Sequence, residues 1–132
     1  MCRENDCSCL NDTLELIIAL QNKNNPSCDD ETCARPFLGP TPNIICFNTR
    51  PITLYNCCTG ALWEFPYTLN DTTGTSTVFR AESLDDCCLT CRLLAPSDDP
   101  NVDYVATNSF FTINLKCVGA LKCLADTYLT NV

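Results

Sequence analysis

The sequence predicts a mainly β, disulfide-rich fold, namely an antiparallel β-sandwich or barrel of about seven short strands with one N-terminal α-helix. Three observations predict it. Apolar residues recur at helical spacing only near the N-terminus. Farther along the chain they alternate with polar residues in short runs, which turn residues separate every ~8–12 positions. Thirteen of the 132 residues are cysteine, a density typical of disulfide scaffolds and of thiolate metal binders.

The length of the chain predicts a single domain over residues 1–132. Residues 1–9 are expected to form a flexible cysteine-rich arm, and residues 10–23 the helix. Residues 24–43 contain several prolines and are expected to be irregular. Residues 44–132 then form the β body.

The helix has a recognisable start and one apolar face. Asp12 or Asn11 is expected to cap it, because Glu15 follows Asp12 at capping-box spacing. This face is expected to pack on the body of the domain, with a helix-mediated contact between subunits as the alternative. Its members are Leu10, Leu14, Ile17 and Ile18.

Strands are predicted wherever short alternating runs lie between turn residues. Residues 70–76 are expected to be a loop and residues 83–86 a hairpin turn. Pro66 argues that its run is an edge strand or contains a bulge. Residues 119–126 fit either a helical turn or a further strand. The predicted strands cover residues 44–48, 52–56, 61–68, 77–82, 87–94, 102–107 and 109–117.

The charge and hydropathy of the chain exclude several classes of partner. Sixteen acidic and eight basic residues give a net charge of -8, which repels phosphate backbones and anionic lipid. We therefore expect no nucleic-acid partner. No apolar run approaches the ~20 residues of a membrane-spanning helix, so no membrane insertion is expected. The polar first residues do not resemble a secretory signal peptide, and none is expected.

No catalytic site is predicted. The chain contains no histidine, so a cysteine nucleophile would lack its usual base. The acidic pairs lie in turn contexts, where aspartate is common for backbone reasons. No phosphate-binding glycine loop or metalloprotease motif is present. We therefore expect a non-enzymatic protein without a cofactor.

Strand geometry separates some cysteines by face. In a strand over residues 87–94, Cys87 and Cys91 share an apolar face, whereas Cys88 lies on the polar face. The second vicinal pair, Cys57 and Cys58, lies at a turn, where both thiols could be exposed. Adjacent cysteines seldom bridge to each other, because their Cα atoms are only ~3.8 Å apart.

These arguments divide the thirteen cysteines into two groups. A thiol that is exposed or in a loosely held segment can reach another subunit, and the odd total leaves at least one thiol unpaired within a monomer. The candidates for inter-subunit disulfides are Cys2, Cys7, Cys9, Cys28, Cys33, Cys57, Cys58 and Cys88. The candidates for burial or for bridges within the chain are Cys46, Cys87, Cys91, Cys117 and Cys123.

Metal binding by thiolates is the alternative. A zinc site needs four ligands, usually in compact pairs. Cys88 and Cys91 form one such pair, and Cys7 with Cys9 is the nearest second one. Their spacing matches no known finger or ribbon, so we assign no metal ligand.

Several longer segments together resemble the CotY/CotZ–ExsY family of spore outer-coat (crust) and exosporium proteins. They occur in the family's order and cover most of the chain. The segments are CLNDTLELIIALQ at 9–21, PFLG at 36–39, NTRPITLY at 48–55, FRAESLDDCC at 79–88 followed by LTCRLL, and TINLKCVGALKCL at 112–124.

The resemblance implies a structural function. Proteins of this family are made in the mother-cell cytoplasm without a signal peptide and are deposited on the spore surface. They self-assemble into ordered two-dimensional arrays that cysteines cross-link, and they give the spore mechanical and chemical resistance. The implied partners are copies of the chain itself, other coat or exosporium proteins and surface glycoproteins. Family members are often longer, and some begin with a histidine-rich stretch that is missing here.

Overall fold

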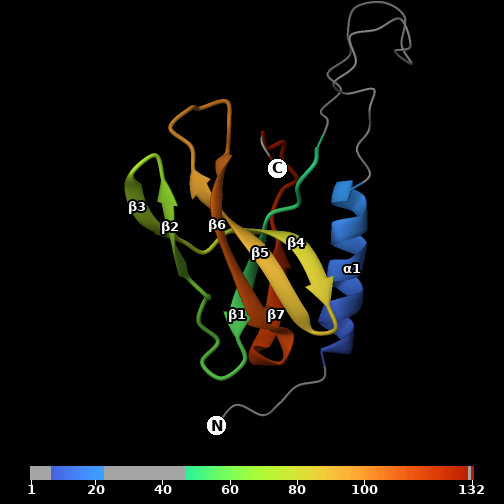
Figure 1. The fold of residues 1–132 in the computed structure, drawn as a ribbon. Helices are drawn as coiled ribbons and strands as arrows, with labels where there is room; N and C mark the ends of the chain where they lie inside the picture. The colour runs from blue at the N-terminus through green and yellow to red at the C-terminus, as the bar shows by residue number, and fades with distance from the viewer. Residues whose placement is uncertain (1–6, 23–46, 131) are drawn as a thin grey trace, which may run out of the picture.

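The computed structural model describes residues 7–22, 47–130 and 132, which form one helix and seven strands (Figure 1). The mainly β fold with one N-terminal helix and antiparallel sheets is as predicted. A short 3-10 helix, η1 (Leu115–Cys117), joins the last two strands. The other elements are α1 (Ser8–Asn22), β1 (Ile52–Asn56), β2 (Phe65–Leu69), β3 (Thr72–Ser76), β4 (Phe79–Asp85), β5 (Cys88–Pro96), β6 (Tyr104–Asn114) and β7 (Val118–Cys123).

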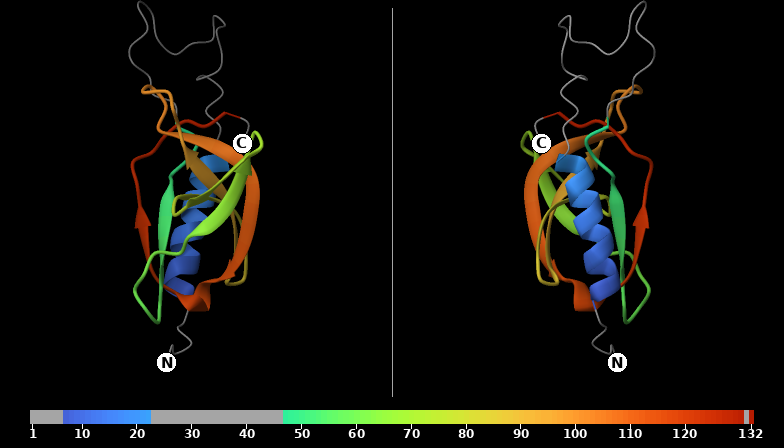
Figure 2. Two further views of the ribbon diagram at one scale, coloured as in Figure 1. Left: turned by 90° about the vertical axis from the view of Figure 1, so that its left-hand side faces the viewer. Right: turned by 90° about the vertical axis from the view of Figure 1, so that its right-hand side faces the viewer.

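Five strands form one antiparallel sheet in the order β6-β5-β4-β1-β7, and β2 pairs with β3 in a separate hairpin. β1 pairs with β7 along its whole length, but its register with β4 includes only Ile52 opposite Phe79. The sheet therefore consists of two parts that meet at this point. Figure 2 shows α1 between the β1–β7 part and β6 when the molecule is seen from either side.

Three phenylalanines connect the β2–β3 hairpin to the main sheet. Phe65 of β2 stacks on Phe111 of β6 with ring centroids 4.0 Å apart. Phe79 of β4 meets Phe111 edge-on at 4.7 Å, and its own side chain is fully buried. Such aromatic pairs contribute ~0.5–1.5 kcal/mol beyond the burial of their surface. The hairpin is thus part of the hydrophobic core.

The apolar face of α1 packs against the same core, next to β4. Leu14 and Ile17 are almost completely buried, and Leu10 and Ile18 are partly buried around them. Gln21 completes the contact at the end of the helix. Its Nε2 donates a hydrogen bond of 2.8 Å to the carbonyl of Ala81, and its Oε1 accepts one of 3.1 Å from the Arg50 amide.

The predicted cap of α1 is wrong. The helix begins earlier, and the Asn11 amide donates to the carbonyl of Cys7 at 2.7 Å, which makes Cys7 the residue that precedes the first turn. The Asn11 side chain has another role, because its Oδ1 accepts a hydrogen bond of 3.3 Å from the amide of Cys87. The hydrogen bond from the Cys87 amide to Asn11, rather than a local capping box, therefore holds the start of the helix.

The predicted loop over residues 70–76 contains a strand. β3 spans Thr72–Ser76 and pairs with β2 through a two-residue turn, Asn70 and Asp71, whose φ values are 49° and 66°. Asparagine and aspartate tolerate this left-handed conformation, and two-residue turns of this kind suit the twist of a hairpin. Pro66 lies in β2, in the two-stranded hairpin, which agrees with its expected place at an edge.

The second hairpin turn is also displaced from its predicted place. Residues 83–85 continue β4, and the turn consists of Asp86 and Cys87, with φ values of 39° and 66°. The two strands predicted over 102–107 and 109–117 form one long strand, β6. A shift in its pairing with β5 lies near Thr107, whose hydroxyl donates a hydrogen bond of 2.7 Å to the carbonyl of Leu93.

The ends of the β body differ from expectation. Residues 119–126, for which two structures were open, contribute the strand β7. Of the predicted strand 44–48, only 47 and 48 are described, and this stretch forms no strand but an isolated bridge from Thr49 to Thr127. The predicted strand 61–68 begins only at Phe65. The predicted irregular stretch 24–43 lies outside the described residues.

Candidate functional site

A disulfide between Cys7 and Cys87 joins the start of α1 to the turn between β4 and β5. The two residues are 80 positions apart in sequence, and their Cα atoms are 5.9 Å apart. Cys7 is only 7% exposed, whereas Cys87 is half-buried. Cys7 was a candidate for a bridge to a neighbouring subunit, whereas in the structure its sulfur is paired with Cys87 of the same chain. Because α1 packs on the core, Cys7, the residue before its first turn, is held against the turn between β4 and β5.

The backbone around Cys87 is closely held. Its positive φ of 66° costs a residue with a Cβ roughly 1–2 kcal/mol, and glycine is usual at this turn position. The amide of Cys87 donates to Asn11, and its carbonyl accepts a hydrogen bond of 2.8 Å from the amide of Leu115. Helix, turn and η1 therefore meet at this residue.

Two exposed free thiols flank the disulfide. Cys9 lies two residues after Cys7 in the first turn of α1, and Cys88 follows Cys87 as the first residue of β5. Cys88 lies opposite Asp85 on β4 and Asn114 on β6. Both residues had been predicted to be accessible from outside. Whether they bond to a neighbouring subunit stays a prediction.

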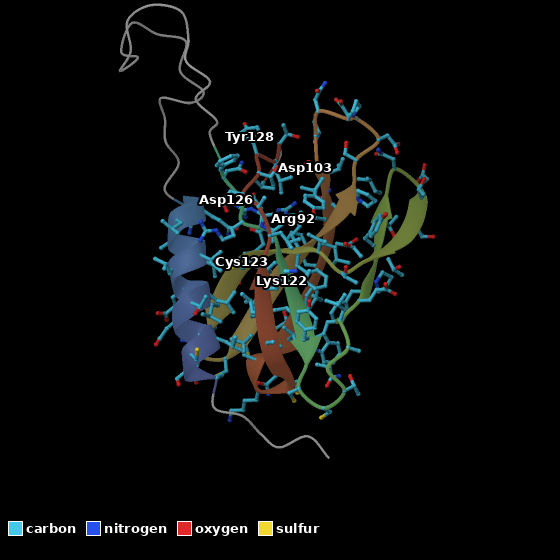
Figure 3. All side chains as sticks on the ribbon, turned by 180° about the vertical axis from the view of Figure 1, so that it is seen from behind. Arg92, Asp103, Lys122, Cys123, Asp126 and Tyr128 are labelled. Atoms are coloured by element: carbon cyan, nitrogen blue, oxygen red, sulfur yellow. A yellow bond between two sulfur atoms is a disulfide. The ribbon has the colours of Figure 1, made fainter. Side chains whose placement is uncertain are left out.

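Cys117 and Cys123 were expected to be buried or bridged within the chain, but both are exposed free thiols. Cys117 lies in η1 rather than in a strand, so alternation along a strand does not apply to it. Cys123 is the last residue of β7, which is an edge strand of the five-stranded sheet. No further strand covers it among the described residues. Figure 3 shows Cys123 beside Lys122 on this strand.

Cys91 is a core residue. It is fully buried in β5, opposite Ala81 on β4 and Phe111 on β6, and it carries a free thiol. Burial raises the pKa of the Cys91 thiol, and the negative charge of Glu82 raises it further. The neutral thiol therefore behaves as a small apolar side chain, in the position that the alternation of this strand predicts.

Cys57 and Cys58, the adjacent cysteines after β1, are not bonded to each other. The sulfurs of Cys57 and Cys58 are 3.9 Å apart, far beyond the length of a disulfide. Both side chains have partners in the structure, so neither is counted among the thiols that are available to a neighbour. The other predicted candidates lie outside the described residues; they are Cys2, Cys28, Cys33 and Cys46.

A charged network lies across β4 and β5 and was not predicted from the sequence. Glu82 accepts hydrogen bonds from Arg80 at 2.8 Å and from Arg92 at 2.9 Å. The side chains of both arginines are largely buried. Arg80 also donates to the hydroxyl of Thr49 at 2.9 Å and to the carbonyl of Asn48 at 3.2 Å. The network therefore fixes the segment before β1 onto the sheet, which is a structural role.

A second ion pair joins the segments on either side of the β1–β7 part. Arg50 donates to both oxygens of Asp126, at 2.7 and 3.1 Å. The hydrogen bond from Arg50 lowers the pKa of the Asp126 carboxyl below its usual value. A small hollow of about 50 Å³ lies between this pair and the end of α1, where Leu20 and Phe47 are exposed. It has room for only a few waters.

No ligand set for a metal is found in the described part of the chain. There, no group of three or more cysteine, aspartate or glutamate side chains could hold an ion.

Within residues 7–22 and 47–130, no helix is long and apolar enough to cross a membrane. The chemistry that the described residues offer here is that of sulfur, namely the Cys7–Cys87 disulfide with exposed thiols beside it and at the edge strand.

Comparison with known proteins gives one finding. The family model for spore coat protein Z matches residues 2–126, almost the whole chain. No curated protein and no solved structure matches the chain.

Proposed function

The chain belongs to the spore coat protein Z family, and on that premise we propose that it is a structural subunit that assembles with copies of itself into a disulfide-cross-linked layer of the spore coat. Membership of this family supports a structural role and deposition on the spore surface. The closer grouping with CotY and ExsY, and the choice between crust and exosporium, belong to the proposal. Production in the mother-cell cytoplasm and partners among other coat proteins and surface glycoproteins belong to it too.

The observation that carries the proposal is the set of exposed free thiols on a packed domain. Cys9 and Cys88 lie beside the Cys7–Cys87 disulfide, Cys117 ends η1 just before β7, and Cys123 is the last residue of β7. Thiols in two separate places allow one molecule to bond to more than one neighbour. A layer, rather than a dimer, requires at least two such contacts.

Charge explains why a covalent bond would matter. A net charge of -8 makes copies repel each other at long range, and salt confines this repulsion to within ~8–10 Å. Contact between copies must therefore depend on short-range interactions. A disulfide across such a contact makes dissociation depend on a chemical step, which is kinetic stability. This property suits a protective layer.

Electron microscopy of the purified protein, with and without reductant, tests the proposal. We expect ordered arrays in both conditions, with greater resistance to heat and detergent after oxidation. Mass spectrometry of the oxidised arrays should then find disulfides that join two chains at one or more of the four exposed positions. A protein that stays monomeric after oxidation, with every disulfide confined to one chain, would contradict the proposal.

A matched pair of variants makes the test sharper. The variant in which Cys9, Cys88, Cys117 and Cys123 are all serine should still assemble but should dissolve more readily in hot detergent. The control is Cys91→Ala, which removes a buried free thiol that cannot reach a neighbour. Its arrays should keep the resistance of the parent. Equal resistance of the quadruple variant and the parent would exclude these four thiols as the cross-links.

A further inference from the structure

We propose that the Cys7–Cys87 disulfide is a thiol–disulfide exchange site, at which the Cys88 thiolate of a second copy attacks Cys87 and releases Cys7. This inference rests on the proposed function, because it specifies how the first bond between two subunits forms. It assigns different roles to the two sulfurs of one disulfide. Their difference in exposure, their backbone contacts and their neighbours all support this assignment.

Exposure decides which sulfur is attacked. Exchange requires an approach of the incoming thiolate to one sulfur of the disulfide. Cys7 is only 7% exposed, beneath the start of α1, whereas Cys87 is half-buried in a turn between two strands. Cys87 is therefore the sulfur that another molecule can reach. Cys88, the attacking residue, is exposed immediately beside it.

The place of Cys7 suits a leaving group. Its carbonyl accepts the first hydrogen bond of α1, so its side chain lies at the helix N-terminus, and no acidic residue occupies the first turn. The partial positive charge of a helix N-terminus favours a thiolate there. Exchange is faster when the departing sulfur is a more stable thiolate.

Cys87 stays in place after the exchange. Its carbonyl still accepts from Leu115, and its amide still donates to Asn11, because neither bond involves the sulfur. The helix is still held by the burial of Leu14 and Ile17. The new bond therefore starts from a fixed point on the domain, and the domain does not have to unfold.

The step balances without an oxidant. The Cys88 sulfur of one copy forms a bond to Cys87 of the other, the bond from Cys87 to Cys7 breaks, and its electron pair leaves on Cys7 as a thiolate. One disulfide is consumed and one is formed, so an intrachain bond becomes an interchain bond. The Cys7 thiolate then takes up a proton from water or attacks a further disulfide.

The charges around the turn predict which thiols react fastest. Asp85 and Asp86 directly precede Cys87. Lys116 follows Leu115, whose amide donates to the Cys87 carbonyl. The two exposed carboxylates lie closest in sequence to the attacked sulfur and repel an anionic reagent. We therefore expect cysteamine to react about threefold faster than 2-sulfanylethanesulfonate, and we expect added salt to reduce this difference.

The test traps the products of exchange without oxygen. The protein carrying the Cys7–Cys87 disulfide is incubated with cysteamine, quenched in acid and alkylated with a maleimide. Mass spectrometry should find cysteamine on Cys87 and maleimide on Cys7. An adduct on Cys7, or no adduct before denaturant is added, would overturn the proposal. Cys9→Ser should leave this result unchanged; loss of the Cys87 adduct would show instead that Cys9 rearranges the bond within the chain.

A second measurement follows the protein–protein step. Without oxygen, the protein alone should form dimers joined through Cys87 and Cys88, and Cys88→Ser should slow their formation at least ~10-fold. Cys123→Ser, which removes an exposed thiol elsewhere, should form them at the parent rate. Equal rates for both variants would overturn the assignment of Cys88. The two proposals can fail separately. If arrays form but cysteamine is found on Cys7, the exchange site is wrong and the proposed function stands. If cysteamine is found on Cys87 but the protein stays monomeric, the proposed function is wrong and the exchange site stands.

Discussion

Arg80 and Arg92 lie directly opposite one another on β4 and β5, although like charges in this position repel. Glu82 offsets this repulsion, because its Oε2 accepts a hydrogen bond from Arg80 and its Oε1 accepts one from Arg92. An irregularity in the pairing of β4 with β5 occurs at this residue, between Ala81 and Ser83. A bulge in the strand and a three-membered charge network therefore coincide.

Loss of this carboxylate should destabilise the domain. Glu82→Gln leaves two largely buried guanidinium groups without their counterion, and we expect the free energy of unfolding to fall by ~2–3 kcal/mol. Denaturant unfolding measures the change. The control is Glu64→Gln, which alters an exposed glutamate and should change the stability by less than ~0.5 kcal/mol. Equal effects of the two substitutions would show that the network contributes nothing specific.

Gln21 provides a second test of long-range packing. Gln21→Ala removes both hydrogen bonds of a buried side chain, to Ala81 and to the Arg50 amide. We expect a loss of ~1–3 kcal/mol, because the partners are left unsatisfied. Asn22→Ala, at the exposed next position, should have little effect. Hydrogen exchange should also show faster opening of α1 in the Gln21 variant but not in the Asn22 variant.

The disulfide and the turn can be separated by two double variants. Replacing Cys7 and Cys87 by serine should cost ~2–4 kcal/mol, because a long loop in the unfolded chain is no longer closed. Cys7→Ser combined with Cys87→Gly should recover ~1 kcal/mol of this loss, because glycine adopts a φ of 66° without strain. Thermal or denaturant unfolding compares the two. A glycine variant no more stable than the serine variant would contradict this explanation of the turn.

The ion pair between Arg50 and Asp126 predicts a dependence of stability on pH. The pKa of Asp126 is lowered in the folded protein, so its contribution is present above the pKa of the unfolded chain, ~3.9, and is lost as the pH falls through the folded value. Asp126→Asn should therefore be less stable than the parent at pH 7, by at most ~1 kcal/mol for a pair this exposed. The difference should disappear in strong acid. A difference that persists there would have another cause.

The five free thiols of the described residues should divide into two classes of reactivity. Cys9, Cys88, Cys117 and Cys123 are exposed and should react with a maleimide within minutes in the native protein. Cys91 is fully buried, and burial raises the pKa of its thiol, so it should react at least ~100-fold more slowly until the domain is unfolded. Peptide mapping of the labelled protein distinguishes the five positions. Fast labelling of Cys91 would contradict its place in the core.

Periodicity predicted the parts of the fold in which one side of an element is apolar. The burial of Leu14 and Ile17 follows from the apolar face of the helix, and the burial of Cys91 follows from the alternation in β5. The same reasoning failed at β3, because its threonines carry no apolar alternation. It also failed at Cys117 and Cys123, because an edge strand and a 3-10 turn cannot be recognised from neighbouring residues.

The candidate site depends on contacts that spacing does not determine. Cys7 and Cys87 are 80 residues apart, and thirteen cysteines permit many pairings, so their bond could not be deduced from sequence. The role of Glu82 was equally hidden, since it depends on the register of two strands. Local composition predicted how rich the chain is in thiols, whereas the fold determines which of them are paired, buried or exposed.

The single point of pairing between β1 and β4 has a consequence for how the chain acquires its structure. β4, β5 and β6 are neighbours both in sequence and in the sheet, so they can form early as a meander. β1 is synthesised before them, but its main partner is β7. We therefore expect β1 to lack its main partner during translation until β7 has emerged from the ribosome. The β1–β7 pair would then close late, which lengthens the time in which aggregation competes with folding.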